Sequence, residues 1–262
     1  MSMESSGAKS DMPAAVGTEI RLAPLAIRRD AEIFAADGGW FQARWHFSFD
    51  QYFDPENMRI GTLRVFNHDT LMPGAVWPMH PHRDIEGITY VVGGTFEHAD
   101  SAGNGGVLYP GAVQRVTLDS GLMHSERNRS KTEPMQFIQM WILPSRRGLP
   151  PSIEQWQFAV EDRHNRLLQI LRPEGTEGSG VTVHQDASMY VSQLDAGVAL
   201  RHEFRDRRCG YFYLISGAID LNGERLTTGD AAKGLGRGLL RVHAQEPSHL
   251  LLVDTPLWPR SP

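Results

Sequence analysis

Two short histidine-containing runs carry the residues best suited to chemistry in this chain. The first is His80-Pro81-His82 and the second is His124-Ser125-Glu126. Side chains two residues apart project to the same face of a strand, roughly 7 Å apart at Cα, so both members of each pair can reach one cation. Three imidazoles and one carboxylate suit Fe(II), Mn, Ni, Cu, Co or Zn at neutral pH, and they leave positions open for a substrate or dioxygen. The pattern therefore predicts a catalytic metal site.

The elements that must position these residues are short strands. Glycine and proline are frequent, with 26 and 16 copies, and they separate short apolar runs such as residues 87–92 and 136–143. This punctuation is typical of an all-β sandwich or barrel. We expect few helices. Residues 152–160 are the best short candidate, because the segment opens with a serine that can cap a helix and a glutamate follows closely.

An internal repeat indicates two copies of one β-barrel unit. The run TYVVGGTF at residues 89–96 is echoed by FYLISGAI at residues 212–219. Further along, Pro110-Gly111-Ala112 is echoed by Thr228-Gly229-Asp230. Since repeats determine architecture, the chain is predicted to be a tandem pair of barrels.

The division of the chain follows from this repeat. Residues 1–19 are rich in Ser, Ala and Gly without an apolar run long enough for a signal peptide or membrane span, so we expect a disordered leader. Residues 144–151 hold three prolines and a glycine, which predicts a linker between an N-terminal metal-binding barrel at 20–148 and a C-terminal barrel at 149–262. The second barrel offers Arg201-His202-Glu203 where a second His-x-His is expected. We therefore expect it to be degenerate, binding no metal and acting as a scaffold or lid.

Composition narrows the classes of function. A net charge of −5 and a pI near 6.1 argue against direct binding of nucleic acid, because the basic stripe that neutralises phosphates is missing. Cys209 is the only cysteine, which excludes an intramolecular disulfide and fits a reducing cytoplasm. We expect a cytoplasmic protein without direct nucleic-acid or membrane partners. Its oligomeric state stays open, and a monomer is compatible with the sequence.

Residue types at set spacings give the chain a resemblance to a known family. The two motifs of the cupin superfamily are matched by Gly74-x5-His80-x-His82-x3-Glu86-x6-Gly93, then by Pro110-Gly111 and His124-x3-Asn128. Together with the upstream run Trp45-His46-Phe47-Ser48-Phe49, the two histidine runs look like the pirin family, from about residue 39 to 257. The resemblance implies an all-β bicupin, that is, two tandem jelly-roll cupin barrels with few short helices. It also implies one metal, commonly iron, in the N-terminal barrel.

The resemblance implies a ligand set as well. The family motif carried over to this chain gives His80, His82, His124 and Glu126 as metal ligands. Cupins in general offer a rival carboxylate, which here is Glu86. If the chain stays extended after His82, Glu86 lies roughly 13 Å further along, although a turn directly after His82 would bring it back. We favour Glu126 as the ligand and expect Glu86 to orient an imidazole from behind.

A candidate reaction also comes from the resemblance, because bacterial pirins are associated with quercetin 2,3-dioxygenase activity. In that reaction the flavonol 3-hydroxyl is deprotonated and binds the metal, dioxygen adds across C2 and C4, and the ring opens with loss of carbon monoxide. Glu126 is the natural base, Fe(II) the expected cation, and a small aromatic substrate and dioxygen the expected partners. The alternative is a metal-binding regulatory or redox-sensing protein acting through protein contacts, as eukaryotic pirins are regarded. A metal-dependent isomerase or hydrolase is the third possibility.

Two further groups of residues surround these motifs. Large side chains precede and follow the ligands, and we expect most in the core and a few at the barrel mouth, where they would hold a planar substrate. They are Trp45, Phe47, Phe49, Phe53, Trp77, Phe137, Met140 and Trp141. Histidines without a paired donor are expected on the surface or hydrogen-bonded in the core. They are His46, His68, His98, His164, His184 and His249.

Overall fold

Strands account for nearly all of the regular structure of this protein. The computed structural model describes residues 24–101, 103–118 and 122–258, and within these ranges the helical parts are three short 3-10 segments. They are Asp30–Glu32, Pro55–Asn57 and Glu161–Arg163. The prediction of an all-β fold with few short helices is confirmed, while the expected leader at 1–19 lies outside the described residues. No helix in the described ranges is long and apolar enough to cross a membrane.

The first barrel consists of two antiparallel sheets. Its large sheet has the order β12-β9-β6-β11-β4-β3-β2 and its small sheet the order β5-β10-β7-β8. The strands of the large sheet are β12 (Ser152–Gln157), β9 (Ala112–Thr117), β6 (Glu86–Gly93), β11 (Met135–Ile142), β4 (Leu63–Leu71), β3 (Phe41–Trp45) and β2 (Phe34–Asp37). Those of the small sheet are β5 (Val76–His82), β10 (Leu122–Asn128), β7 (Phe96–Asp100) and β8 (Gly105–Leu108).

The second barrel repeats this plan. Its large sheet has the order β1-β20-β17-β22-β15-β13-β14 and its small sheet the order β16-β21-β18-β19. The large sheet contains β1 (Ala26–Arg28), β20 (Ala231–Leu235), β17 (Arg208–Ser216), β22 (Ser248–Pro256), β15 (Ser188–Leu194), β13 (Leu168–Pro173) and β14 (Val181–Val183). The small sheet contains β16 (Ala199–Phe204), β21 (Gly238–Ala244), β18 (Ala218–Leu221) and β19 (Glu224–Thr227). Two tandem cupin-type barrels are thus confirmed.

The internal repeat of the sequence lies on matching strands. Its first copy spans β6 and the start of β7, and its second copy spans β17 and the start of β18. At the turn within each copy, Gly94 and Gly217 have φ values of +78° and +100°. Gly111 and Gly229, in the second echo, have φ values of +90° and +87°. Both barrels therefore place glycine where the chain turns through the left-handed region, which other residues rarely adopt.

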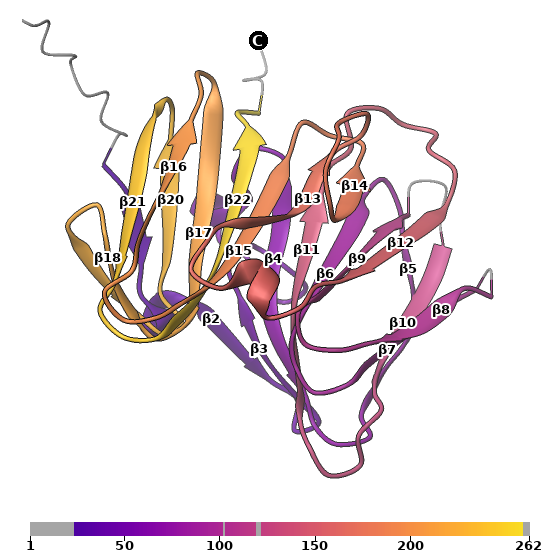
Figure 1. Ribbon diagram of the computed structural model, residues 1–262. Coiled ribbons are helices and arrows are strands. Elements are labelled where there is room, and N and C mark those ends of the chain that lie inside the picture. Colours follow the sequence, from indigo (N-terminus) through magenta and orange to yellow (C-terminus); the bar gives the residue numbers. More distant parts are fainter. Residues whose placement is uncertain (1–23, 102, 119–121, 259–262) are drawn as a thin grey trace, which may run out of the picture.

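The two large sheets pack face to face, which gives the molecule four layers. Figure 1 shows the small C-terminal sheet on the left, the two large sheets in the middle and the small N-terminal sheet on the right. Successive side chains of β6 point alternately into two different hydrophobic cores. Ile88 and Tyr90 pack between the barrels with Tyr211 and Leu251 of the other large sheet. Val91 packs inside the first barrel, so both faces of β6 are buried, as its nearly continuous apolar run predicts.

Histidine and tyrosine side chains make hydrogen bonds across the interface between the barrels. Each pair joins a residue of one large sheet, or the segment beside it, to a residue of the other. The pairs are His46 Nδ1 with Tyr211 Oη at 2.6 Å, His68 Nδ1 with Tyr213 Oη at 2.8 Å, and His249 Nε2 with Tyr90 Oη at 3.0 Å. Burial lowers the pKa of His68 to about 4 and that of His249 to about 3. These histidines are neutral, hydrogen-bonded core residues, as predicted.

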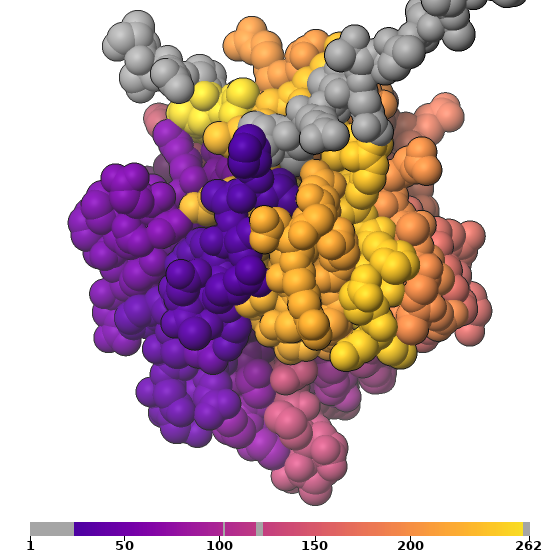
Figure 2. Space-filling view, turned by 90° about the vertical axis from the view of Figure 1, so that its left-hand side faces the viewer, coloured from indigo at the N-terminus to yellow at the C-terminus, as the bar shows by residue number. Residues whose placement is uncertain are grey.

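Edge strands are exchanged between the barrels. Strand β1 precedes the first barrel yet pairs with β20 of the second, and β12 follows residues 144–151 yet pairs with β9 of the first. Figure 2 shows the indigo N-terminal segment against the orange and yellow C-terminal half. An ion pair of 3.0 Å between Arg29 and Asp230 fastens this contact. The division into 20–148 and 149–262 stays a prediction, and the exchanged strands tie both parts together.

The helix predicted at residues 152–160 is wrong. Ser152–Gln157 form strand β12, which pairs with β9 along its whole length. The Ser152 hydroxyl accepts a hydrogen bond from Arg115 of β9 at 2.5 Å, instead of capping a helix. The open edge of β9 outweighs the local capping signal, because it supplies backbone partners that a short isolated helix lacks.

Candidate metal centre

Three imidazoles from two neighbouring strands meet at one point. His80 and His82 lie on β5, and His124 pairs directly opposite His80 on β10. Their candidate ligand atoms all lie within 4.8 Å of one another, and their ring centroids are 4.5, 4.6 and 4.8 Å apart. The structure therefore brings together the three histidines that the sequence spacing selected.

The nitrogen atoms of this cluster fit a bound cation. His80 Nδ1 donates a hydrogen bond of 2.7 Å to the carbonyl oxygen of Pro78, so Nε2 is the nitrogen left for a metal. Both ring nitrogens of His124 are buried without a hydrogen-bond partner in the described structure. An unsatisfied buried polar atom costs about 1–3 kcal/mol, a cost that coordination removes. A divalent metal thus fits the cluster.

His82 and His124 are held in the neutral form that coordinates metals. Burial lowers the pKa of His82 to about 4 and that of His124 to about 2, and the neighbouring histidines add to both shifts. At neutral pH the two side chains therefore present lone pairs, and protons do not compete with the cation.

Glu126 lies beside the cluster on the same strand as His124. Its Oε1 is 3.3 Å from Nδ1 of His124, although the two atoms make no hydrogen bond with each other. The pairing with β5 changes register between these two residues, because β5 has one extra residue opposite Ser125, and such a bulge re-aims side chains at sites. Burial and the nearby charge of Asp69 raise the pKa of Glu126 to about 8. Its role as the fourth ligand stays a prediction.

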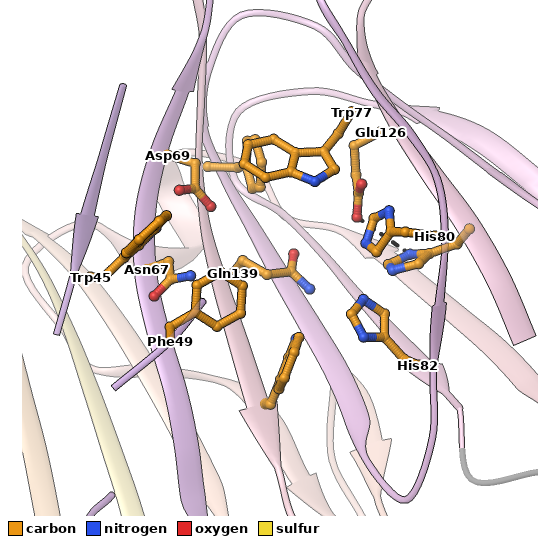
Figure 3. Close-up of a pocket in the computed structure, with 12 residues that line it drawn as sticks. Trp45, Phe49, Asn67, Asp69, Trp77, His80, His82, Glu126 and Gln139 are labelled. Atoms are coloured by element: carbon orange, nitrogen blue, oxygen red, sulfur yellow. Dashed lines mark ion pairs between the residues drawn. The ribbon is translucent and has the colours of Figure 1, made fainter. Parts of the chain in front are cut away.

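The cluster faces a pocket inside the first barrel, shown in Figure 3. The pocket has a cavity volume of about 80 Å³, and of about 480 Å³ when the space of its open mouth is counted. Large aromatic side chains make up much of its wall, namely Trp45, Phe49, Trp77, Phe137 and Trp141. Trp141 also packs edge-on against His82 with 4.7 Å between the ring centroids. A flat apolar ring can therefore lie close to the imidazoles.

Other aromatic candidates lie elsewhere. Phe47 and Met140 belong to the core between the barrels, and Phe53 is 74% exposed. The difference follows from strand alternation, because Met140 and its neighbour Trp141 point to opposite faces of β11.

Polar side chains of the large sheet complete the pocket. Asn67 and Asp69 lie on β4 and Gln139 lies on the neighbouring β11. Figure 3 shows Asn67 and Asp69 across the pocket from His80 and His82. Burial raises the pKa of Asp69 to about 8. This group was not predicted from the sequence, although Asn67 and Asp69 have the same i, i+2 spacing that identified the histidines.

Glu86 does not line the pocket, and the imidazole that its carboxylate contacts is that of His184, at 2.7 Å, so its predicted role in orienting a metal-ligand imidazole is wrong. A turn at Asp84, with φ of +59°, does follow β5. However, Glu86 shares its face of β6 with Ile88, which packs between the barrels. Its carboxylate accepts hydrogen bonds from Thr117 Oγ1 at 3.0 Å and from the backbone N–H of His184 at 2.8 Å. Glu86 therefore joins the two barrels.

His98 is a histidine whose position the sequence did not predict. It lies on β7, pairs opposite Glu126 and is 1% exposed. Its ring is 5.5 Å from that of His124, outside the cluster of three. Neither of its ring nitrogens has a hydrogen-bond partner in the described ranges, and burial lowers its pKa to about 4. The expectation of a surface or hydrogen-bonded histidine is wrong here, and only strand pairing could have revealed the contact.

The two barrels can be compared position by position through their pairing registers. Gly94 and Gly217 occupy the same position in the two barrels. His98 lies four residues after Gly94 and Leu221 lies four residues after Gly217, so the two residues correspond. His98 pairs with Glu126, and Leu221 pairs with Val242. Val242 therefore occupies the position of Glu126.

The remaining site positions follow from the same register. Leu240, two residues before Val242, corresponds to His124 and pairs with His202, as His124 pairs with His80. Two residues beyond His202, Phe204 takes the place of His82. Three of the four predicted ligand positions are thus apolar in the second barrel, and Phe204, Leu240 and Val242 belong to its buried core. That the second barrel binds no metal stays a prediction, which these replacements support.

Two cupin-type barrels in tandem, with an imidazole cluster that fits a divalent metal in the first, define the class of protein as a bicupin. Family comparison refines this class. The profile described as Pirin matches residues 27–142, and the profile described as Quercetinase C-terminal cupin domain matches residues 169–255. This chain belongs to the pirin family.

Similar proteins extend over nearly the whole chain. The quercetin 2,3-dioxygenase of Escherichia coli K12 is 35% identical over 232 residues, which cover 88% of this chain and 98% of that protein. A pirin-like protein of Caulobacter vibrioides is 35% identical over 219 residues, covering 84% and 94%. Among solved structures, the bacterial pirin YhhW of Escherichia coli in complex with nickel(II) superposes with a TM-score of 0.83 at 33% identity. That superposition covers 89% of this chain and 100% of that one.

Proposed function

We propose that this protein is a mononuclear metal-dependent dioxygenase of the pirin type, which opens flavonols such as quercetin. The observation that carries the proposal is the convergence of three imidazoles on a pocket with aromatic walls. A relative named quercetin 2,3-dioxygenase, at 35% identity, supports the same activity. The combination suits a flat substrate that binds a cation through oxygen.

His80, His82 and His124 would hold the cation, with Glu126 as the fourth ligand. Fe(II) is the expected metal, while Zn, Mn, Ni, Cu and Co accept the same nitrogen and oxygen donors. The nickel(II) in the related pirin structure supports a divalent metal in this family. Bound iron(II) would supply a redox-active Lewis acid with positions open for substrate and dioxygen.

Glu126 is the residue proposed to move the proton. Its carboxylate lines the pocket beside His124, where it would accept the proton of a bound hydroxyl group on release from the metal. We assign it the removal of the proton from the flavonol 3-hydroxyl. Phe49 and Trp141 would hold the flat ring system in place and exclude water from the reacting carbons, which lowers the entropic cost of the reaction.

The expected partners are a small aromatic substrate and dioxygen. No direct nucleic-acid or membrane partner is expected from the charge and the sequence pattern. We retain the cytoplasm as the expected compartment, since the single cysteine, Cys209, is a buried free thiol.

The regulatory alternative requires a different kind of site. A redox sensor would read the oxidation state of its metal through an intact surface above a sealed centre. His80 and His82 are only partly buried and face a pocket with an open mouth, which favours the enzyme. Zinc in the purified protein together with no oxygen chemistry would favour an isomerase or hydrolase.

Oxygen uptake with quercetin tests the proposal on the iron(II)-reconstituted protein. We expect oxygen consumption and release of carbon monoxide by the wild type, and loss of both in His82→Ala. His164→Ala is the matched control, because His164 is half exposed and pairs with Asp195 in the second half of the chain. The control should retain wild-type rates, and equal rates in wild type and His82→Ala would contradict the proposal.

A further inference from the structure

A row of polar side chains lines the pocket without hydrogen-bond partners. Within the part of the chain that the structure describes, Trp45 Nε1, Asn67 Oδ1 and Asp69 Oδ1 are buried and unpartnered. The three residues are 2%, 3% and 5% exposed, and all of them line the pocket. Trp45 pairs directly with Asn67 across β3 and β4, and Asp69 follows two residues later on the same face. The three side chains therefore form one continuous wall.

Folding alone does not account for this wall. Buried polar atoms are nearly always hydrogen-bonded, and each exception costs about 1–3 kcal/mol. The neighbouring positions on the same sheet, Leu71 and Phe137, are apolar and pack in the core of the barrel. Three exceptions on one wall of a pocket indicate that a ligand supplies the missing partners.

Gln139 shows which hydrogen-bonding groups the wall presents. Thr89 Oγ1 donates a hydrogen bond of 2.8 Å to Gln139 Oε1, which leaves the amide Nε2 as the donor for the pocket. In Figure 3 the Gln139 amide lies between Asn67 and the histidines. The wall thus offers donors at Gln139 and Trp45 and acceptors at Asn67 and Asp69.

A phenolic hydroxyl matches this arrangement, because it donates one hydrogen bond and accepts others. A carboxylate or phosphate does not match it. The pocket-lining residues, as far as the structure describes them, include no lysine or arginine that would pair with an anion. Uncharged hydroxyl groups on a flat aromatic frame are the ligand chemistry that fits both the polar wall and the aromatic walls.

We propose that Trp45, Asn67 and Asp69 form a hydroxyl-binding subsite, which recognises the phenolic groups of the substrate that are remote from the metal. The inference rests on the proposed function, because it assigns the metal-binding end of the substrate to the imidazoles. It narrows the substrate to polyhydroxylated aromatics and makes these three side chains determinants of specificity.

Equilibrium binding of two flavonols tests the subsite separately from catalysis. Quercetin and 3-hydroxyflavone share the 3-hydroxy-4-keto unit that binds a metal, but 3-hydroxyflavone has no other hydroxyl group. Both are titrated into the nickel(II)-loaded protein without oxygen, and binding is followed by tryptophan fluorescence. We expect quercetin to bind about 10- to 100-fold more tightly, in line with the cost of leaving the wall unpaired.

Variants of the wall residues test whether these side chains cause the difference in affinity between the two flavonols. Trp45→Phe removes the indole N–H and keeps an aromatic ring, and Asn67→Leu replaces the amide by a side chain of similar size. Each should lower quercetin affinity by about 5- to 10-fold and leave 3-hydroxyflavone affinity within about 2-fold. Thr70→Ala is the matched control, since Thr70 follows Asp69 on the opposite face of β4. The control should bind both flavonols as the wild type does.

The outcomes separate the subsite from the proposed reaction. Equal affinities of the wild type for both flavonols, or equal losses of both in the variants, would overturn the subsite. Binding of neither flavonol would overturn it as well. The expected binding pattern without oxygen uptake by the iron(II) protein would support the subsite and contradict the dioxygenase.

Discussion

The two barrels share one strand order but differ in what fills them. The first barrel places His124 and Glu126 against a pocket, whereas Leu240 and Val242 occupy the same register positions in the core of the second. An apolar side chain in a closed core stabilises the fold by about 1.5–3 kcal/mol through burial. A buried imidazole or carboxylate contributes less and needs a partner. The comparison indicates that the first barrel carries the candidate site, while the matching positions of the second barrel add to its apolar core.

Buried polar atoms without hydrogen-bond partners also lie mainly in the first barrel. Among the described residues, the buried side-chain atoms without hydrogen-bond partners all lie at or before Arg172, and those of the pocket belong to the first barrel. From β14 onward the chain satisfies the buried polar side-chain atoms that the structure describes. A protein can keep a costly polar site when a neighbouring element offsets its cost. Here the offset comes from a copy of the same unit, held against the site-bearing sheet by the core between the barrels.

The largest expected effect is loss of metal on removing a histidine from the cluster. Residues that merely support metal ligands cost about 10- to 100-fold in affinity when mutated, so we expect His124→Ala to lower nickel(II) affinity by more than about 100-fold. Oxygen uptake should vanish with the metal. Titration calorimetry with nickel(II) and metal analysis after dialysis measure the effect.

His202→Ala is the control for that prediction, because His202 occupies the matching position of His80 in the second barrel. It makes a hydrogen bond of 2.8 Å to Asp254 and should leave metal content unchanged. A normal metal content in His124→Ala, or a loss in His202→Ala, would break the proposed contrast between the barrels.

Truncating the apolar residue that corresponds to His124 in the second barrel should lower stability and leave the metal content unchanged. Leu240 is 2% exposed, and Leu240→Ala is expected to lower the free energy of unfolding by about 2–5 kcal/mol, through lost burial and the cavity left behind. Urea denaturation at fixed metal concentration measures this. Leu235→Ala is the control, since Leu235 is 52% exposed and should change stability by less than about 0.5 kcal/mol. A small effect at Leu240 would mean that the second barrel is not the stabilising partner.

Local pattern was sufficient to predict the strands of the barrels and the common face of His80 and His82. Strand alternation brings His80 and His82 to one face, and the repeated glycine turns at Gly94 and Gly217 mark equivalent hairpins. Both signals are short-range, because they depend on residues two to six positions apart. Strand alternation and glycine turns therefore predict local structure without knowledge of the rest of the fold.

Features that depend on distant pairing could not be predicted in this way. Glu86 has a spacing that allows ligation, yet the packing of the second barrel on β6 buries it against His184 instead. The segment 152–160 has a capping signal, yet the open edge of β9 draws it into the sheet. His98 comes to lie beside His124 only through the pairing of β7 with β10. In each case a contact between residues more than 25 positions apart overrides the local preference.

The core between the barrels predicts a pH dependence of stability. The pKa of His249 is lowered from 6.5 to about 3 in the folded protein, so the unfolded chain binds its proton at a higher pH than the folded chain does. Stability should therefore fall as the pH decreases below about 6.5, with His249 contributing about 2 kcal/mol of loss by pH 5. Urea denaturation of wild type and His249→Gln between pH 7 and pH 5 measures this contribution. His249→Gln should show the shallower decline, whereas parallel profiles would assign the titration to other groups.

The smallest expected effect tests the exchange of strand β1 between the barrels. Asp230 lies where the first barrel has Ala112, and it accepts hydrogen bonds from Arg29 Nη1 at 3.0 Å and from the backbone N–H of Asp30 at 2.9 Å. Arg29 is nearly half exposed, so Arg29→Ala should lower the free energy of unfolding by only about 1 kcal/mol. The comparison variant is Arg146→Ala, whose ion pair with Glu174 is about half exposed on both sides and should matter less. Thermal and urea denaturation of both variants compare the two ion pairs. A larger decrease in the free energy of unfolding for Arg146→Ala would contradict the proposed role of Asp230 in holding β1. If the ranking holds, the acidic residue that distinguishes this turn from its counterpart in the first barrel helps to hold β1 on the second.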